Sequence, residues 1–300
     1  MIQISENDEV IDICLDNVFK AVFTKNTPES VGALSNLLSA VIGRDVSVIA
    51  VIANEPAIDN LRDRQIRFDI NCKTDGGKLM NVEMSLNPDK FEPVRLEFYA
   101  GKLFTGQDIK GAGKTYSDLK DAYQIAFLVN GRFFADGDFL HAFEYYDQQK
   151  EVSLGGRTHI ITVELAKLEY LKDTPVPEMT APERWAFYFR YITDREKRGK
   201  VNEIIAFEEG IEMASEVLMT ISRDEAERAR LMSEYKYELD TQSRIAYARQ
   251  EGEQRGGAEG EQRGRREGAL EIARKMKKRN APLEQIAEDT GLSWDVIAKL

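Results

Sequence analysis

Cysteine is scarce in this chain of 300 residues, which has only Cys14 and Cys72, both inside apolar segments. Two such thiols exclude a disulfide framework and are typical of buried thiols in a reducing cytoplasm. No apolar run approaches the roughly 20 residues that span a bilayer, and the acidic N-terminus lacks the basic region of a secretory signal. These absences predict a soluble cytoplasmic protein with no membrane partner.

A general excess of basic charge is also missing, because the formal net charge is −11. Coating nucleic acid by counterion release needs a broad basic surface, so that class is excluded. Residues 244–279 are the exception, with eleven Lys or Arg against six Glu. Contact with nucleic acid therefore needs a local basic patch or a metal ion. The two histidines, His141 and His159, lack metal-ligand spacing and receive no role.

Residues 1–174 alternate helical and strand patterns and are expected to form one domain. Apolar spacing predicts helices over 11–23, 28–42 and 93–110, and strands over 46–53, 66–72, 79–86, 123–129, 139–146 and 159–168. Thr27 is a candidate helix cap, with Pro28 at the first helical position. The order of these elements predicts an α/β fold with a mixed sheet flanked by helices.

After residue 174 the pattern is helical. Within residues 175–250 the apolar pattern predicts three helices. One begins at Ala181, and the others cover 201–220 and 222–249. In residues 251–280 a glycine recurs every fourth position from Gly252 to Gly268, which suits either a helix that packs closely on another or a charged, partly disordered linker. Isolated helix propensity favours the linker. Residues 281–300 predict two short helices joined at Gly291, with Ser293 as a cap, like a helix-turn-helix.

Two acids, Asp69 and Glu83, lie in the strands over 66–72 and 79–86, which the turn at 75–77 joins into a hairpin. Side chains on a strand alternate between faces, so the two acids are expected on the face opposite the apolar side chains of Ile70, Cys72, Val82 and Met84. Two acids on one face of adjacent strands can share a divalent cation. The alternative is that both are solvated on an exposed sheet face.

Hydrolysis of phosphodiester bonds with Mg²⁺ needs oxygen ligands that leave positions open for phosphate and water. Asp69 and Glu83 supply carboxylates, and the backbone carbonyl of Met84 is expected to complete the protein ligands. Ser85, on the same face as Glu83, is expected to face the attacking water. The predicted catalytic residues are therefore Asp69, Glu83 and Ser85.

Three motifs in order resemble the Rpn recombination-promoting nucleases and related transposase-like proteins of the PD-(D/E)XK nuclease superfamily. They are Asp16-Asn17-Val18-Phe19-Lys20-Ala21-Val22-Phe23, Arg67-Phe68-Asp69-Ile70 with Val82-Glu83-Met84-Ser85, and Arg95-Leu96-Glu97-Phe98-Tyr99 leading to Gly113-Lys114-Thr115-Tyr116. The resemblance implies a restriction-endonuclease-like fold and a DNA endonuclease dependent on Mg²⁺ or Mn²⁺. It implies Asp69 and Glu83 as metal ligands, Asp16 as a third carboxylate, and a role in recombination, transposition or defence against foreign DNA.

One position departs from that pattern, because the superfamily has Lys and this family commonly Gln where this sequence has Ser85. A lysine stabilises developing charge, and its loss costs on the order of 10² to 10³ in rate if nothing replaces it. Lys73, on the strand face of Asp69, and Lys102, on the following helix, are candidates to supply that charge. Each is alternatively an ordinary solvated surface residue.

Four residues are candidates for contact with DNA: Lys20, Arg95, Tyr99 and Lys102. Arg95 and Tyr99 are four residues apart and share a helix face, which can meet a substrate phosphate. Tyr99 is alternatively a core residue, and Lys20 alternatively covers a helix end.

Two other functions remain open. A nuclease fold that has lost catalysis can survive as a DNA-binding or assembly protein, as Ser85 and the helical tail suggest. In the other, the tail is the functional element: residues 252–268 pair protomers, and residues 283–300 read DNA or bind a partner. DNA and a second copy of the chain, joined through the C-terminal helices, are the predicted partners.

Overall fold

The computed structural model describes residues 2–52, 69–109 and 113–300, and for residues 238, 242, 245, 246 and 248–259 it describes the backbone alone. The described chain divides into two compact units, Met1–Tyr235 and Lys236–Leu300. The predicted strand residues 53 and 66–68, and the glycine-rich helix end at 111–112, lie outside the described residues. The four-part division at 174, 250 and 280 stays a prediction.

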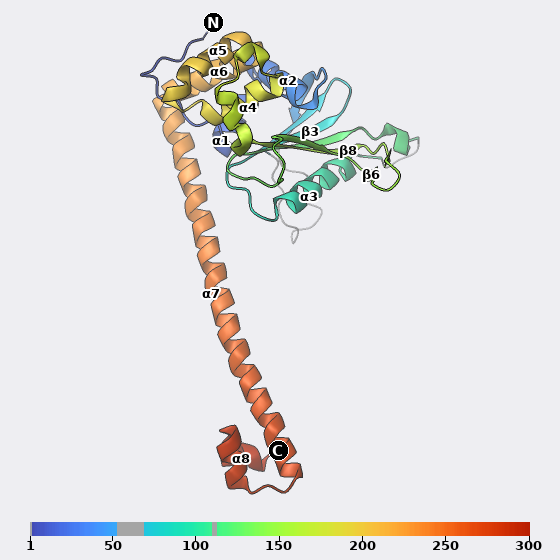
Figure 1. The fold of residues 1–300 in the computed structure, drawn as a ribbon, viewed down its shortest axis with the longest axis vertical. Coiled ribbons are helices and arrows are strands. Elements are labelled where there is room, and N and C mark those ends of the chain that lie inside the picture. The colour runs from blue at the N-terminus through green and yellow to red at the C-terminus, as the bar shows by residue number, and fades with distance from the viewer. Residues whose placement is uncertain (1, 53–68, 110–112) are drawn as a thin grey trace. The chain divides into compact units, whose positions relative to one another are not determined.

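A mixed six-stranded sheet forms the centre of the first unit (Figure 1). Its strands, in spatial order, are β1 (Val48–Ile52), β2 (Ile70–Thr74), β3 (Leu79–Ser85), β4 (Ala122–Leu128), β8 (Thr158–Glu164) and β5 (Leu140–Phe143). Strands β3, β4 and β8 are parallel to one another, and the other neighbours pair antiparallel. A separate two-stranded sheet consists of β6 (Tyr146–Asp147) and β7 (Val152–Ser153). The predicted α/β class is confirmed.

Helices cover both faces of the sheet (Figure 1). Helix α3 (Glu92–Thr105) lies on one face, against β4 and β8. The other face carries α1 (Asp16–Phe23) and α2 (Pro28–Ile42), and α2 in turn packs against α4 (Ala181–Tyr191) and α6 (Glu209–Arg223), next to α5 (Arg198–Phe207). The main hydrophobic core fills this second side, with tightly packed rings of Phe19, Phe23, Phe127, Trp185 and Phe189.

Local sequence sets the ends of the first two helices. Helix α2 begins as predicted, because the Thr27 hydroxyl accepts a hydrogen bond from the Ser30 amide at 3.3 Å and Pro28 follows it. The predicted start of the first helix at Ile11 is wrong, since α1 begins at Asp16. The Asp12 carboxylate accepts a hydrogen bond from the Cys14 amide at 2.9 Å, and such local bonds compete with helix formation.

The single helix predicted over 201–220 is two helices in the structure, α5 and α6, which meet at Glu208 in an extended conformation. The Glu208 carboxylate holds this break by binding both Arg184 and Asn36. A Cβ at Gly210 would lie 2.3 Å from Asn36, so the start of α6 approaches α2 as closely as only glycine permits.

Three other predicted elements end early. Helix α3 stops at Thr105 rather than residue 110, strand β5 stops at Phe143, and strand β8 stops at Glu164. After β8 the chain continues as 3₁₀ turns over Leu165–Lys172. Further short 3₁₀ turns cover Tyr116–Asp118, Val176–Glu178 and Arg195–Lys197.

The glycine-repeat segment is helical, so the linker favoured by propensity is wrong. It belongs to α7 (Glu225–Lys278), a continuous helix of 54 residues. Extending a helix avoids the unfavourable nucleation step. Glutamates four residues before a cation add to its stability, as in Glu261 with Arg265 and Glu271 with Lys275.

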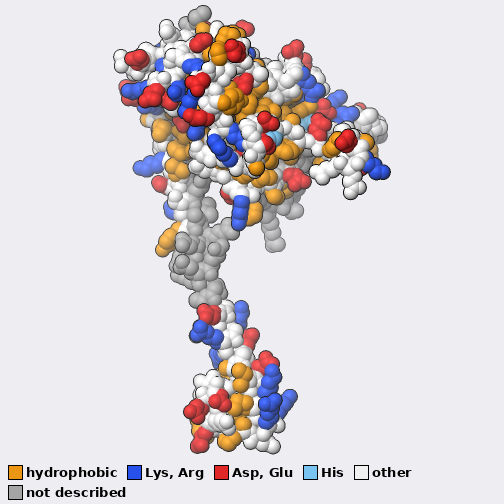
Figure 2. All heavy atoms as spheres, in the orientation of Figure 1, with side chains coloured by type: hydrophobic (Ala, Val, Ile, Leu, Met, Phe, Trp, Pro, Cys, Tyr) orange, Lys and Arg blue, Asp and Glu red, His pale blue; other side chains and the backbone are white. Residues whose placement is uncertain are grey.

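The C-terminal unit has a small core of its own, formed by Ala273, Ile286 and Ile297. Two short helices, α8 (Leu283–Thr290) and α9 (Trp294–Ala298), follow α7 and are joined at Gly291 with φ of 65°, as predicted. Figure 2 shows apolar side chains on this unit beside a group of basic ones. Exposed apolar residues near this small core include Ile272, Leu283 and Trp294. Self-association through these helices stays a prediction.

Both cysteines are buried and free, as predicted. Among the described helices, none combines the length and the apolar character required to cross a lipid bilayer.

Candidate active site

The hairpin of β2 and β3 places Asp69 beside Glu83. Ile70 pairs with Val82 and Asn71 with Asn81, so the same register puts Asp69 opposite Glu83. The apolar side chains expected on the other face, those of Ile70, Cys72, Val82 and Met84, are all in the main core. The predicted alternation is therefore confirmed for the described residues, and both acids lie on the α3 side of the sheet.

Glu83 is buried, with 3% of its surface exposed, so the alternative of a solvated sheet face is wrong for this acid. Gln124 of β4 donates from Nε2 to Oε2 of Glu83 at 3.1 Å, and its Oε1 accepts a hydrogen bond from Asn81 at 2.8 Å. This network fixes the orientation of Glu83. Sequence reasoning missed Gln124, although a fully buried glutamine in an otherwise apolar strand is a signal that could have found it.

Helix α1 adds a third carboxylate and a cation. Nζ of Lys20 lies 2.7 Å from Oδ2 of Asp16 and 3.2 Å from Oδ1 of Asp69. The predicted motif residue Lys20 therefore contacts Asp69 directly, and Asp16 is joined to the hairpin through Lys20. Oδ1 of Asp16 is buried and accepts no hydrogen bond from any described residue.

Helix α3 brings a second cation to the acids. The Arg95 guanidinium pairs with the carboxylates of both Glu83 and Glu92. It also lies over the ring of Tyr99, 5.7 Å from the ring centroid, so the expected shared face of Arg95 and Tyr99 is confirmed. Tyr99 is half-buried and packs against Leu103, as its alternative core role anticipated.

The remaining predicted site residues lie around this cluster. The Met84 amide donates to Oδ2 of Asp69 at 3.1 Å, while metal binding by its carbonyl stays a prediction. Ser85 is half-buried at the end of β3. Lys73 and Lys102 are exposed, which agrees with their surface alternative. Within residues 2–52, 69–109 and 113–300, the cation that contacts Asp69 is Lys20.

Burial and like charge both raise the carboxyl pKa values. Burial is the main reason that the pKa of Asp69 rises far above its ordinary value, and the nearby charges of Asp16 and Glu83 add to it against the opposing effect of Lys20. Burial likewise raises the pKa of Glu83 to about 7, although Arg95 opposes this. Burial lowers the pKa of Lys20, but Asp69 and Asp16 more than offset this and raise it.

We expect the metal-free protein to lose stability between about pH 5 and pH 8. The folded chain holds protons on Asp69 and Glu83 that the unfolded chain has released in this window, so the free energy of unfolding falls as pH rises. For Glu83, a rise from 4.5 to about 7 corresponds to at most about 3 kcal/mol. Urea unfolding in EDTA at both pH values measures the fall.

The Asp69→Asn variant isolates the contribution of its carboxyl group. Its stability relative to the parent should increase from pH 5 to pH 8, since the amide does not ionise. A gap that stays constant across this window would contradict the raised pKa of Asp69.

The described residues contain no group of three or more His, Cys, Asp or Glu side chains arranged to hold a metal ion. Lys20 and Arg95 instead pair with the carboxylates. The side chains of Asp16, Asp69 and Glu83 nevertheless offer carboxylate oxygens, which are the ligands that a hard divalent cation prefers. Oδ1 of Asp16 is also a buried acceptor without a partner among the described residues.

A mixed α/β sheet with acids on adjacent strands and a further acid on the first helix defines a nuclease-like protein. The family model described as PD-(D/E)XK nuclease family transposase matches residues 13–248. The chain belongs to this family. Searches among curated proteins and among solved structures gave no match.

Proposed function

We propose that this protein hydrolyses phosphodiester bonds of DNA with the help of a divalent cation, Mg²⁺ or Mn²⁺. The observation that supports this most is the hairpin that sets Asp69 opposite Glu83, with Asp16 of α1 joined to Asp69 through Lys20. Withdrawing Asp69 and Glu83 together from solvent is costly for folding unless they serve a ligand. Family membership makes DNA the favoured substrate.

In this proposal Asp69, Glu83 and Asp16 hold the cation, with the Met84 carbonyl as a further ligand. When bound, the cation supplies Lewis-acid polarisation of the phosphate and activation of water. Gln124 keeps Glu83 oriented through its 3.1 Å hydrogen bond. Because Lys20 and Arg95 pair with the same carboxylates, both must release them as the cation binds. Their charges are then free to bind substrate phosphate.

Lys20 is our candidate for the charge that is missing at Ser85. It reaches the acids from α1, it is largely withdrawn from solvent, and the acids raise its pKa, so it stays protonated at neutral pH. A protonated amine at this position can stabilise charge that develops on the phosphate. Ser85 is short and neutral and can only orient water. Lys102, Arg95 and Tyr99 remain candidates for contact with the DNA backbone.

Cleavage of supercoiled plasmid tests the proposal. We expect the full chain to convert plasmid to nicked or linear DNA in Mg²⁺ or Mn²⁺ and to lose this activity in excess EDTA, because the carboxylates alone cannot activate water. Calorimetry with Mn²⁺ should show binding at the same protein concentration. A protein that cleaves equally well in EDTA would contradict the cation dependence.

A second candidate is a DNA-binding protein that retains the fold without catalysis. The pairing of Lys20 and Arg95 with the acids favours it, because the described cluster is already charge-compensated without a metal. Under this alternative, Mn²⁺ gives no binding signal in calorimetry while duplex DNA still binds.

A further inference from the structure

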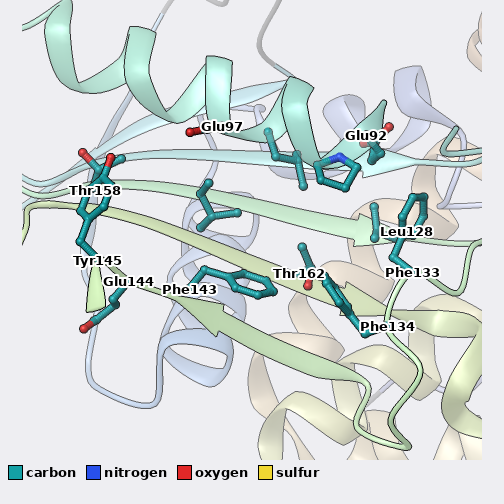
Figure 3. A pocket seen from close by; sticks show the side chains of 13 residues that line it. Glu92, Glu97, Leu128, Phe133, Phe134, Phe143, Glu144, Tyr145, Thr158 and Thr162 are labelled. Carbon is teal, nitrogen blue, oxygen red and sulfur yellow. The ribbon is translucent and has the colours of Figure 1, made fainter. Parts of the chain in front are cut away.

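A cavity of about 260 Å³ lies between α3 and the strands β4, β8 and β5. It is beside the acids Asp16, Asp69 and Glu83, which we call the acid cluster. Its walls are mainly apolar and aromatic: Leu96, Leu128, Phe133, Phe134, Phe143 and Ile160. Figure 3 shows Glu92 and Phe133 at one end and Tyr145, Glu144 and Thr158 at the other, with Thr162 between them. Neither the proposed hydrolysis nor the residues predicted from the sequence use this cavity.

Thr162 lies in the wall of the cavity and carries a buried hydroxyl. It is 3% exposed and lines the cavity, yet its Oγ1 forms no hydrogen bond with any residue in the described ranges. Its strand partner His141 also has a buried Nδ1 that lacks a hydrogen bond from the described chain. A buried hydroxyl without a partner costs free energy, so a ligand that bonds to it would recover that cost.

The strand register places Thr162 close to the acids. Glu83 pairs with Ala126, and Ala126 pairs with Thr162, so the three side chains lie in a row on the same face of the sheet. Two strand spacings separate the ends of this row by about 10 Å. Glu92 connects the two sites, since it lines the cavity and binds the same Arg95 that pairs with Glu83.

We propose that this cavity binds a single unpaired nucleobase of the DNA whose phosphate lies at the acid cluster. This inference rests on the proposed function and narrows its substrate to DNA with an unpaired or flipped base. Aromatic walls suit the faces of a flat ring, and Thr162 can hydrogen-bond to a ring edge when its side chain turns the hydroxyl into the cavity. The volume is sufficient for one base.

The charges around the cavity agree with this orientation. Glu97 and Glu144 are exposed where they line the cavity and would repel a phosphate, but they can accept hydrogen bonds from amino groups on a base. Arg95 pairs with Glu83 and with Glu92, which lines the cavity. The phosphate therefore lies toward Arg95 and the base points away from it, along the row from Glu83 to Thr162.

Fluorescence of 2-aminopurine tests the inference with the full chain in EDTA, where binding is measured without cleavage. The probe base is placed in an unpaired position of one DNA and in a fully paired position of a matched duplex. We expect a saturable change in emission for the unpaired probe and a much weaker response for the paired one. Equal responses from the two DNAs would overturn the inference.

Two variants locate the base. Thr162→Val keeps the shape of the side chain and should weaken binding of the unpaired probe roughly fivefold to tenfold. Phe143→Ala removes an aromatic wall and should weaken it about tenfold or more. The matched control is Thr220→Val, since the exposed Thr220 hydroxyl bonds only to Glu216 in its own helix. If Thr162→Val and Thr220→Val bind alike, the inference is overturned.

Thermal unfolding separates a binding role of Thr162 from a structural one. Loss of an unpartnered hydroxyl should leave the melting temperature of Thr162→Val unchanged or higher, and a clear fall in it would overturn the inference. The assay also separates this inference from the proposed function. If the protein binds the unpaired probe but cleaves no plasmid, base binding by the cavity is supported and the nuclease activity is rejected. If it cleaves plasmid but does not respond to the unpaired probe, only base binding by the cavity is rejected.

Discussion

Replacing Asp69 with asparagine is expected to reduce plasmid cleavage by on the order of 10³-fold, since it removes a charged ligand from a cation that contributes several kcal/mol to the transition state. The amide keeps an oxygen that can accept the hydrogen bond from Met84, and Lys20 keeps its partner Asp16. The loss should therefore reflect the cation and not the fold. Initial rates of plasmid cleavage in saturating Mg²⁺ measure it.

Asp45→Asn is the matched control for this variant. Asp45 is an exposed acid in the same unit, between α2 and β1, and its replacement should leave the rate within about twofold, as for most surface substitutions. The stability of Asp69→Asn at pH 8 without metal should at the same time exceed that of the parent. An Asp69→Asn protein that cleaves at the parental rate would remove the acid cluster from the mechanism.

Replacing Lys20 with methionine is expected to reduce the cleavage rate at saturating Mg²⁺ by on the order of 10² to 10³, the usual effect of removing one group that stabilises transition-state charge. Metal affinity should not weaken, because Asp16 and Asp69 lose a cation that competes for their oxygens. A fall in rate without a fall in metal affinity distinguishes loss of a catalytic charge from collapse of the site.

Two further proteins sharpen the test of Lys20. Lys73→Met removes an exposed lysine from the neighbouring strand and should leave the rate nearly unchanged. Ser85→Lys in the Lys20→Met background should restore part of the rate, since it returns an ammonium group to the position where the superfamily carries lysine. If Lys73→Met is as damaging as Lys20→Met, the missing charge comes from β2 instead.

The hairpin and the facing of its acids could be predicted because a strand's alternation is a local property of the sequence. Ile70 pairs with Val82, and Glu83 falls on the opposite face because successive residues of a strand alternate between faces. The start of α2 was equally local, since Thr27 and Pro28 act within one turn. These features needed no knowledge of distant contacts.

The contacts that complete the site were not accessible in this way. Gln124 reaches Glu83 from a strand 41 residues further along the chain, and Arg95 reaches it from a helix on the sheet's outer face. Lys20, rather than Lys73 or Lys102, approaches Asp69 because of the way α1 packs against the sheet. That packing is a tertiary property that residue spacing does not encode. The helical state of the glycine repeat was missed because isolated propensity neglects the continuous helix before it.

Asp69 and Glu83 lie on the sheet face opposite the aromatic core. Mutations that abolish catalysis on one face therefore leave the core on the other face largely intact. Proteins that carry such mutations can still fold and can accumulate further substitutions. Over evolutionary time, inactive descendants should persist as stable proteins, so within this family the presence of the fold is a poor guide to which members still cut. Under the proposed function, the acids together with a cation at position 20 are the better criterion.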